Sequence, residues 1–415
     1  MKTKINRVLL LYIIITTFYV FFSHFIFFSS KININTGYLV ISVAFFIYTF
    51  IINYKDISLD KCDCWLVMYI LYLLISTLTW DLNSEGIKYI IFFITINLIA
   101  WSMKCDTKWI KTIINMMTFC TLIHCIFIIL HAIFPEVILQ LDKSLLNSSA
   151  WKVIEMGTNN NYYSGITLGA ASAGLFSTIL VGIVICKIIS NKKIDFKNTI
   201  FLSIGLIALL LSQKRAFLVA IIISSIVIIY VANKIKGNAA KLIKRFFVFA
   251  IISILLFGIA SFIPQTRNVI NRFIDNDNML SGRETMYEEM ITWFKENMYF
   301  GIGPGTAEQE FGYGGHNIYL QMLAECGIVG ASIYFIYLLK LCATNVKIAI
   351  KGKNADYRIL FTIFMQTVLV IYGITGNPIY DYSYLVIFTY ILIIPRSIKK
   401  ELSSIEKSEC NNTSV

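Results

Sequence analysis

His316 lies in the most unusual stretch of the sequence, a glycine-rich segment that runs directly into an apolar one. Residues 301–330 hold eight of the 22 glycines and one of the four histidines. Glycine permits close approaches and backbone conformations that other residues avoid. A helix predicted from residue 318 would place its N-terminus beside the histidine, where an anion is attracted and a protonated imidazole is disfavoured. The pattern predicts a neutral base next to an anion site, which suits transfer from a phosphate-linked donor to a hydroxyl group.

Lys214 and Arg215 form a second candidate, in the short turn "LSQKRAFLVA" (211–220) between two apolar segments. An interfacial pair whose side chains reach lipid headgroups would explain them. The alternative is an anion site, in which the guanidinium fork of Arg215 binds phosphate oxygens. The turn by itself leaves both interpretations open.

Arg283 is the third candidate, near the start of "SGRETMYEEMITWFKENMYFGIGPG" (281–305). Ser281 and Glu284 have the spacing of a capping box, which predicts that a helix begins here with Arg283 in its first turn, where a cation opposes the helix dipole. The apolar residues at helical spacing are Met286, Tyr287, Met290, Ile291, Phe294 and Met298. The segment is therefore predicted to be an amphipathic helix that rests on the membrane or on the bundle.

Two further outward-facing arginines, Arg267 and Arg272, are better explained as partners of Asp275 and Asp277. The remaining histidines, His24, His124 and His131, fall in or near apolar segments and are expected to be structural.

The elements that must position these residues are membrane spans. The chain of 415 residues is 57% hydrophobic and 14% charged, with a mean hydropathy of +0.71. Apolar stretches long enough to cross a hydrocarbon core of roughly 30 Å recur throughout, and alternating barrel strands do not. The sequence predicts an all-α polytopic membrane protein with about twelve transmembrane helices in a single membrane domain, 1–415. The spans are expected at 8–28, 37–53, 65–80, 87–103, 112–134, 162–186, 198–211, 216–232, 246–262, 318–341, 359–375 and 382–395.

The charge distribution predicts the orientation. Most of the 36 Lys and Arg fall in segments that face the cytoplasm if both termini lie inside, as the positive-inside rule requires. The net charge of +12 then needs no nucleic-acid partner, and membrane lipids are the expected surroundings. This topology gives a cytoplasmic tail at 396–415, an outer loop at 135–161 and a large extracytoplasmic loop at 263–317. The candidate residues all face outward.

Cysteine and motif patterns exclude several classes of site. None of the nine cysteines lies in a predicted outer loop, so a disulfide framework is not expected. Cys62-Asp63-Cys64 lacks the second pair of ligands that a metal site of this kind needs. The phosphate-loop motif G-x-x-x-x-G-K-[ST] and the zinc motif HExxH are both absent. No cofactor or metal is therefore expected.

Four segments together resemble the O-antigen polymerase and O-antigen ligase superfamily. "HNIYLQMLAECGIVG" (316–330) is similar to its His-Asn-x-Tyr-Leu-Gln…Glu-x-Gly-x-x-Gly signature. The segment 281–305 resembles its arginine-initiated amphipathic helix and Gly-x-Gly-x-Gly turn. "LSQKRAFLVA" resembles its Ser-x-Arg-(Gly/Ala) turn, with Gln-Lys inserted before Arg215, and "GTNNNYYSGITL" (157–168) resembles its entry to the following span. The matches come in the family's order and cover roughly residues 155–335.

The resemblance implies a GT-C-like architecture and metal-independent glycosyl transfer at the outer face of the bacterial plasma (inner) membrane. The donor would be an oligosaccharide on undecaprenyl diphosphate, and a chain-length regulator protein would be a partner. By carry-over, Arg215 and Arg283 would hold the diphosphate, and His316 would be the catalytic base. Lys214, Asn161 and Asn317 would help to position the substrate, although the run Asn159-Asn160-Asn161 leaves open which asparagine matters.

Several functions remain open on the sequence. The resemblance favours a polymerase that moves the growing chain onto the next lipid-linked repeat unit. A ligase would instead transfer finished glycan to a lipid A core. A transporter of lipid-linked sugars would carry polar residues at mid-bilayer and paired broken helices, whereas the predicted spans offer few polar residues besides Lys88 and Glu325. A purely structural protein leaves Arg215 and His316 without a role.

Overall fold

The computed structural model describes residues 2–25, 34–53, 61–80, 84–102, 107–191, 195–237, 283–352 and 355–412. Within these ranges the chain is helical and contains no strand, apart from an isolated bridge between Phe25 and Leu146. The helices are α1 (Lys2–Phe22), α3 (Ile34–Asn53), α4 (Lys61–Thr79), α5 (Ser84–Ser102), α6 (Thr107–Ile133), α7 (Pro135–Leu145), α8 (Ser148–Asn159), α9 (Ala170–Asn191), α10 (Phe196–Leu211), α11 (Arg215–Lys236), α14 (Glu284–Glu296), α15 (Thr306–Phe311), α16 (Ile318–Lys351), α17 (Tyr357–Tyr372) and α18 (Tyr382–Asn412).

The predicted all-α membrane fold is confirmed. Among the described residues, seven helices are long and apolar enough to cross a membrane: α3, α4, α5, α6, α9, α11 and α16. Shorter apolar helices lie at Val8–Phe22, in α10 and in α17. Together with α18, these helices account for every predicted span except 246–262, which lies outside the described residues. The protein is therefore a multi-pass membrane protein.

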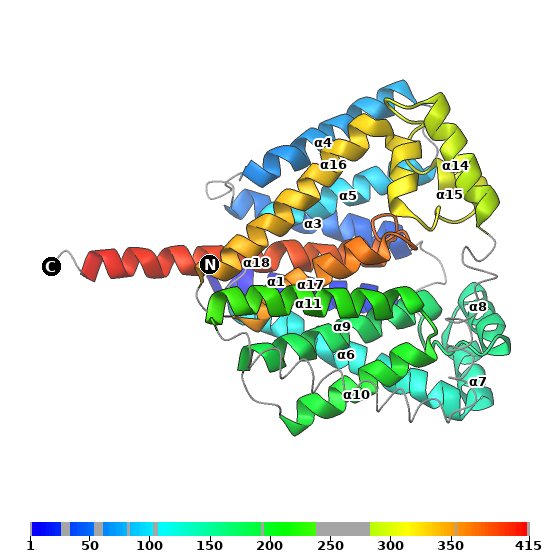
Figure 1. The fold of residues 1–415 in the computed structure, drawn as a ribbon, viewed down its shortest axis with the longest axis horizontal. Coiled ribbons are helices and arrows are strands. Elements are labelled where there is room, and N and C mark those ends of the chain that lie inside the picture. Colours follow the sequence, from blue (N-terminus) through cyan, green and yellow to red (C-terminus); the bar gives the residue numbers. More distant parts are fainter. Residues whose placement is uncertain are drawn as a thin grey trace.

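The helices lie side by side along the long axis of the molecule, so the bundle has two distinct ends (Figure 1). Both termini lie at one end, and α7, α8, α14 and α15 lie at the other (Figure 1). The central helix is α9, because 83% of its apolar stretch is buried. Small residues allow its neighbours to approach closely, as Gly182 packs against Phe364 of α17 and Gly205 of α10 packs against Val181.

Several predicted boundaries are wrong. The outer loop at 135–161 forms two helices, α7 and α8. The span expected from residue 162 begins only at Ala170, because residues 163–167 form a buried non-helical segment. The span expected at 8–28 ends at Phe22, and the tail expected from residue 396 continues α18 through Pro395 to Asn412.

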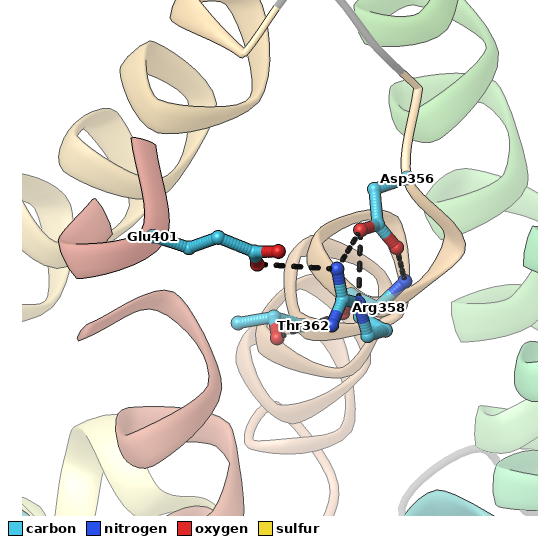
Figure 2. A network of polar contacts seen from close by, with 4 residues as sticks. All are labelled: Asp356, Arg358, Thr362 and Glu401. Atoms are coloured by element: carbon cyan, nitrogen blue, oxygen red, sulfur yellow. Dashed lines mark hydrogen bonds and ion pairs between the residues drawn. The ribbon is translucent and has the colours of Figure 1, made fainter. Parts of the chain in front are cut away.

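Ion pairs hold α18 against the bundle at the end that carries the termini. Figure 2 shows Asp356, which caps α17 by accepting from the Arg358 amide at 2.9 Å and also accepts from Arg358 Nε at 2.8 Å. The same guanidinium reaches Glu401 of α18 at 3.5 Å (Figure 2). Nearer the start of α18, Arg396 pairs with Asp63 of α4. Asp63 is thus committed to an ion pair, which leaves it unsuited to the metal site considered for Cys62-Asp63-Cys64.

The most consequential departure from the sequence prediction is a break in α16. Gly327 has φ 60° and ψ −174°, so α16 consists of two helical pieces, 318–326 and 328–351. The pieces fold toward each other, since the rings of Tyr319 and Phe335 lie 5.4 Å apart although sixteen residues separate them. The span predicted at 318–341 is present within α16, but it is interrupted at Gly327.

The backbone groups freed by this break are paired with residues 298–303. The amides of Ile328 and Val329 donate to the carbonyls of Met298 (2.9 Å) and Tyr299 (3.2 Å). The amides of Ile302 and Gly303 donate in return to carbonyls of the first helical piece, at 3.0 and 2.9 Å. Unpaired backbone groups are costly in apolar surroundings, so this exchange is what permits the break.

Tyr72 of α4 completes the junction. Its hydroxyl lies 2.8 Å from the Phe300 carbonyl and 2.6 Å from the Cys326 carbonyl. Gly301 and Gly327 allow the two backbones to touch, because a Cβ on either residue would lie 2.4 Å from backbone atoms of the opposite segment. The glycines of "GIGPG" and "ECG" are thus explained by contact between backbones.

We expect Gly327→Ala to unfold this junction. The substitution adds a Cβ against the Tyr299 carbonyl in a backbone conformation that disfavours side chains, and should cost more than about 3 kcal/mol. Gly237→Ala is a matched control, because Gly237 has φ 64° but nothing within 4 Å of an added Cβ, so the cost should be about 1 kcal/mol. Thermal unfolding in detergent measures both, and equal losses would contradict this account of the break.

Candidate functional site

The six predicted site residues lie in connections between helices at the end of the bundle opposite both termini (Figure 1). Four connections contribute: the α8–α9 connection, the α10–α11 turn, the start of α14 and the segment before α16. The residues are Asn161, Lys214, Arg215, Arg283, His316 and Asn317.

His316 is a partly buried imidazole at a strained backbone position. Its φ is 52°, which is uncommon for a residue other than glycine. The Tyr313 ring centroid lies 5.5 Å from that of His316, and the Tyr287 hydroxyl donates to the His316 carbonyl at 3.4 Å. Burial, together with the charges of Arg283 and Lys214, lowers the pKa of His316 from 6.5 to about 4. A lowered pKa favours the neutral form of the imidazole, and its main cause is burial rather than the N-terminus of α16.

The start of α16 does not offer the anion site that the sequence suggested. Asn317 is the N-cap, and its side-chain oxygen accepts from the amides of Tyr319 and Leu320, both at 3.1 Å. The Ile318 amide donates to the Gly373 carbonyl at 2.8 Å, and the Gln321 amide donates to the Asn317 carbonyl. These N–H groups are already paired, so positive charge at this site has to come from side chains.

Arg283 is the N-cap of α14, one residue before the helix begins. The cap expected at Ser281 is therefore wrong, and Ser281 itself lies outside the described residues, as do Arg267 and Arg272. The amphipathic helix itself is present: Met286 and Met290 are buried against Ala324 of α16. Ile291 and Met298 instead stay exposed, at 39% and 44%, so the buried face is narrower than predicted.

Lys214 and Arg215 are the N-cap and the first residue of α11. Burial, and then the charge of Arg283, lowers the pKa of Lys214 below its usual value. A cation at a helix N-terminus opposes the dipole, and here Lys214, Arg215 and Arg283 all occupy such positions. Lys214 is thus a partly buried cation close to a second cation, an arrangement that an anion would stabilise.

The residue inserted before Lys214 has a structural role that the sequence did not reveal. Gln213 has φ 54°, and its side-chain amide donates to the Asn161 carbonyl at 2.6 Å. The Tyr163 amide adds a bond to the Leu211 carbonyl at 3.2 Å. Of the three consecutive asparagines, only Asn161 makes this link and has positive φ, at 60°. It contributes its backbone carbonyl, and its side chain is exposed.

Two of the structural histidines hold the α8–α9 connection in place. The Gly165 amide donates to His131 Nδ1 at 3.2 Å, so Nε2 carries the proton and faces Thr158 Oγ1 at 2.9 Å. His24 Nε2 lies 2.7 Å from the Ile166 carbonyl. Gly165 touches the backbone of α6 so closely that a Cβ would lie 2.7 Å from the Ile128 nitrogen. The segment is thus anchored to α6 and to His24, just after α1.

The glycine turn at 301–305 is occupied by the protein's own carboxylate. Glu325 is fully buried and accepts from the amides of Gly305 and Ala307, each at 3.0 Å. These amides belong to the N-terminus of α15, so Glu325 caps that helix from another element. The turn therefore does not bind phosphate. The sequence analysis identified Glu325 only as a polar residue in a predicted span, and its role in capping was not anticipated.

An apolar groove begins beneath the His316 segment and runs between α16, α17 and α18. Its lining includes Ile318 at the upper edge, Phe335 and Leu338 of α16, Leu369 of α17 and Phe388 of α18. Val370 of the same wall is 37% exposed on the flank of the bundle. Within the described part of the chain, no group of three or more His, Cys, Asp or Glu side chains could hold a metal ion.

Residues 199–335 match a family model described as O-antigen ligase. The match spans Lys214, Arg215, Arg283, His316 and Asn317 but not Asn161. The match covers 137 of the 415 residues and agrees with the resemblance to O-antigen polymerases and ligases noted in the sequence. The matched family implies a glycosyltransferase-like enzyme that acts on a lipid-linked glycan. A comparison with curated proteins gave no match.

The low pKa of His316 can be tested without substrate. Diethyl pyrocarbonate modifies neutral imidazole only, so modification of His316 should persist below pH 6 and fall with a midpoint of about 4. Replacing a neighbouring cation, as in Arg283→Gln, should move the midpoint upward. Peptide mass spectrometry at each pH measures the fraction of His316 that is modified. Burial raises the pKa of Glu308 to about 7, so Glu308 titrates well above this range. In the chain without substitutions, a midpoint near 6.5 for His316 would contradict the described environment.

Proposed function

We propose that this enzyme is a repeat-unit polymerase that transfers an undecaprenyl-diphosphate-linked glycan to a hydroxyl of a second lipid-linked unit at the outer face of the plasma membrane. The observation that carries the proposal is the convergence of charge around His316: a neutral imidazole lies within the electrostatic influence of Arg283 and Lys214. Arg215 follows Lys214 directly at the N-terminus of α11.

In the proposed reaction, His316 accepts the proton of the acceptor hydroxyl as that oxygen attacks the anomeric carbon of the donor. The bond between this carbon and the phosphate oxygen breaks, and undecaprenyl diphosphate leaves with the bonding electrons. Arg215, Arg283 and Lys214 neutralise the charge that develops on the diphosphate without a metal ion. The bound diphosphate also offsets the cations beside His316, so the imidazole becomes a stronger base when the donor is present.

The apolar groove is proposed to hold the isoprenoid chain of the donor. Ile318 at its edge is two residues from His316, so a diphosphate held by the cations would place its first isoprene units at the groove. The lining of aliphatic and aromatic side chains suits an isoprenoid, and the exposure of Val370 supports lateral entry from the lipid.

A transporter is the main alternative from another class, and the broken helix α16 is the feature that could support it. In transporters, broken helices line a cavity with free backbone groups. Here the groups at the break are paired with residues 298–303 and Tyr72. The break therefore supports a fixed scaffold for an enzyme better than a path for substrate.

We expect His316→Ala, Arg215→Ala and Arg283→Ala to abolish long-chain glycan in cells while the protein accumulates normally in the membrane. Loss of one charge-stabilising group should lower the transfer rate by about 100-fold to 1000-fold. Lys295→Ala is a matched control, because Lys295 is an exposed cation in the last turn of α14 and should leave the glycan unchanged.

The same strains separate polymerase from ligase. Loss of a polymerase leaves single repeat units attached to the core, whereas loss of a ligase leaves glycan on the undecaprenyl carrier. Full-length polymer in the His316→Ala strain would rule out both. The proposal also includes a chain-length regulator protein as a partner, which cross-linking tests. It further places the protein in the inner membrane with both termini in the cytoplasm, which reporter fusions to the termini test.

A bulky residue in the groove should weaken the binding only of donors with long lipid chains. Leu369→Trp is expected to raise KM for an undecaprenyl donor about tenfold, because it fills space that the chain occupies, and to leave unaffected a donor whose lipid is too short to enter the groove. Ile222→Trp serves as the control, since Ile222 is 55% exposed on α11, away from the groove. Equal effects on both donors would place the chain elsewhere.

A further inference from the structure

A buried chain of hydrogen bonds connects the residue before His316 to the turn that begins α15. The Gly315 amide donates to Gln321 Oε1 at 2.8 Å. The Gln321 side-chain amide donates in turn to Glu325 Oε1 at 3.0 Å. Glu325 also accepts from Gly305 and Ala307. Gln321 and Glu325 are four residues apart on one face of the first piece of α16, and both side chains are fully buried.

This network fixes both ends of the segment that precedes α16. Residues 305–307 are held at one end and Gly315 at the other, so the intervening segment, with α15 and Tyr313, is clamped onto the first piece of α16. A Cβ on Gly315 would lie 2.6 Å from the Met290 sulfur and 3.2 Å from Gln321 Oε1. Gly315 is therefore tightly confined between α14 and the network.

We propose that Gln321 and Glu325 are positioning residues that hold the His316 imidazole in its partly buried orientation. His316 adopts a strained backbone conformation, with φ 52°, and such conformations persist only when their surroundings enforce them. Two contacts are described that would enforce it: the bond from Gly315 to Gln321 and the bond from Tyr287, on the α14 turn after Arg283, to the His316 carbonyl. The catalytic consequence rests on the proposed function, whereas the positioning itself does not.

Each hydrogen-bond donor described in this network faces an acceptor. Each carboxylate oxygen of Glu325 accepts at least one N–H, and the Gln321 amide is oriented by a donor on one side and an acceptor on the other. In Glu325→Gln, the new amide group faces at least one N–H donor and loses a bond. In Gln321→Glu, two carboxylates face each other in a buried site, and the donor to Glu325 is lost.

Single and exchanged variants test the network. Glu325→Gln and Gln321→Glu should each shift the midpoint of diethyl pyrocarbonate modification at His316 from about 4 toward 6.5, because the imidazole becomes more exposed. In the double variant Gln321→Glu/Glu325→Gln, residue 321 can still accept from Gly315 and residue 325 can donate to residue 321, although the Ala307 amide loses its acceptor. The Gly315 end of the network is restored, so the midpoint should return most of the way. Glu289→Gln, an exposed carboxylate on α14, should not shift the midpoint.

Transfer kinetics give an independent measurement. Each single variant should lower kcat about 10-fold to 100-fold with little change in KM for the lipid-linked donor, because the cations that hold the diphosphate remain. The double variant should recover most of kcat.

The outcomes separate the two proposals. An unshifted midpoint and unchanged kcat in properly inserted single variants would overturn the positioning role, as would a double variant no better than the singles. If the midpoint shifts as expected while His316→Ala still makes polymer, the network positions His316 but the proposed function is wrong. For any single variant that fails to insert, Gln321→Asn provides the measurement, since it keeps the amide but shortens its reach and should give the same shift.

Discussion

Backbone pairing between residues 298–303 and the broken helix α16 is the interaction on which the site depends. A helix break in apolar surroundings leaves N–H and C=O groups without partners, and only another backbone or a polar side chain can satisfy them. Here the segment after α14 supplies most of the partners and Tyr72 supplies a hydroxyl. The break redirects the first piece of α16 so that it serves as a platform for α14, α15 and the His316 segment.

Placement of the three cations follows from that platform. Arg283 lies at the start of α14, which packs through Met286 and Met290 on the first piece of α16. Lys214 and Arg215 begin α11, on the other side of the site. Each cation stands at the positive end of a helix dipole, and Lys214 and Arg283 raise each other's electrostatic energy. Positive charge gathered at helix N-termini in this way is stabilised by an anion, which is the physical basis for proposing a diphosphate.

The same surroundings explain how a histidine can act as a base beside cations. Burial removes water from the imidazolium form, and the neighbouring charges act in the same direction, so His316 is neutral at physiological pH. A bound diphosphate would offset the neighbouring positive charges but would not remove the effect of burial. The basicity of His316 is thus coupled to occupancy of the donor site, which favours proton transfer when the donor is present.

The sequence by itself determined the membrane class, nearly all the spans and the candidate residues, because apolar length and charge placement are local properties that the bilayer enforces. His316, Arg215 and Arg283 stood out because the positive-inside rule makes cations uncommon in the segments predicted to face outward. Only the tertiary structure decided how these groups are held. Glu325 caps a helix in a distant element, Gln213 bonds to Asn161, and the N–H groups at the start of α16 are paired with Asn317 and Gly373. Such pairings join residues far apart in the chain, and the polar groups that form them carry no periodic pattern, so their partners are fixed only when the helices pack.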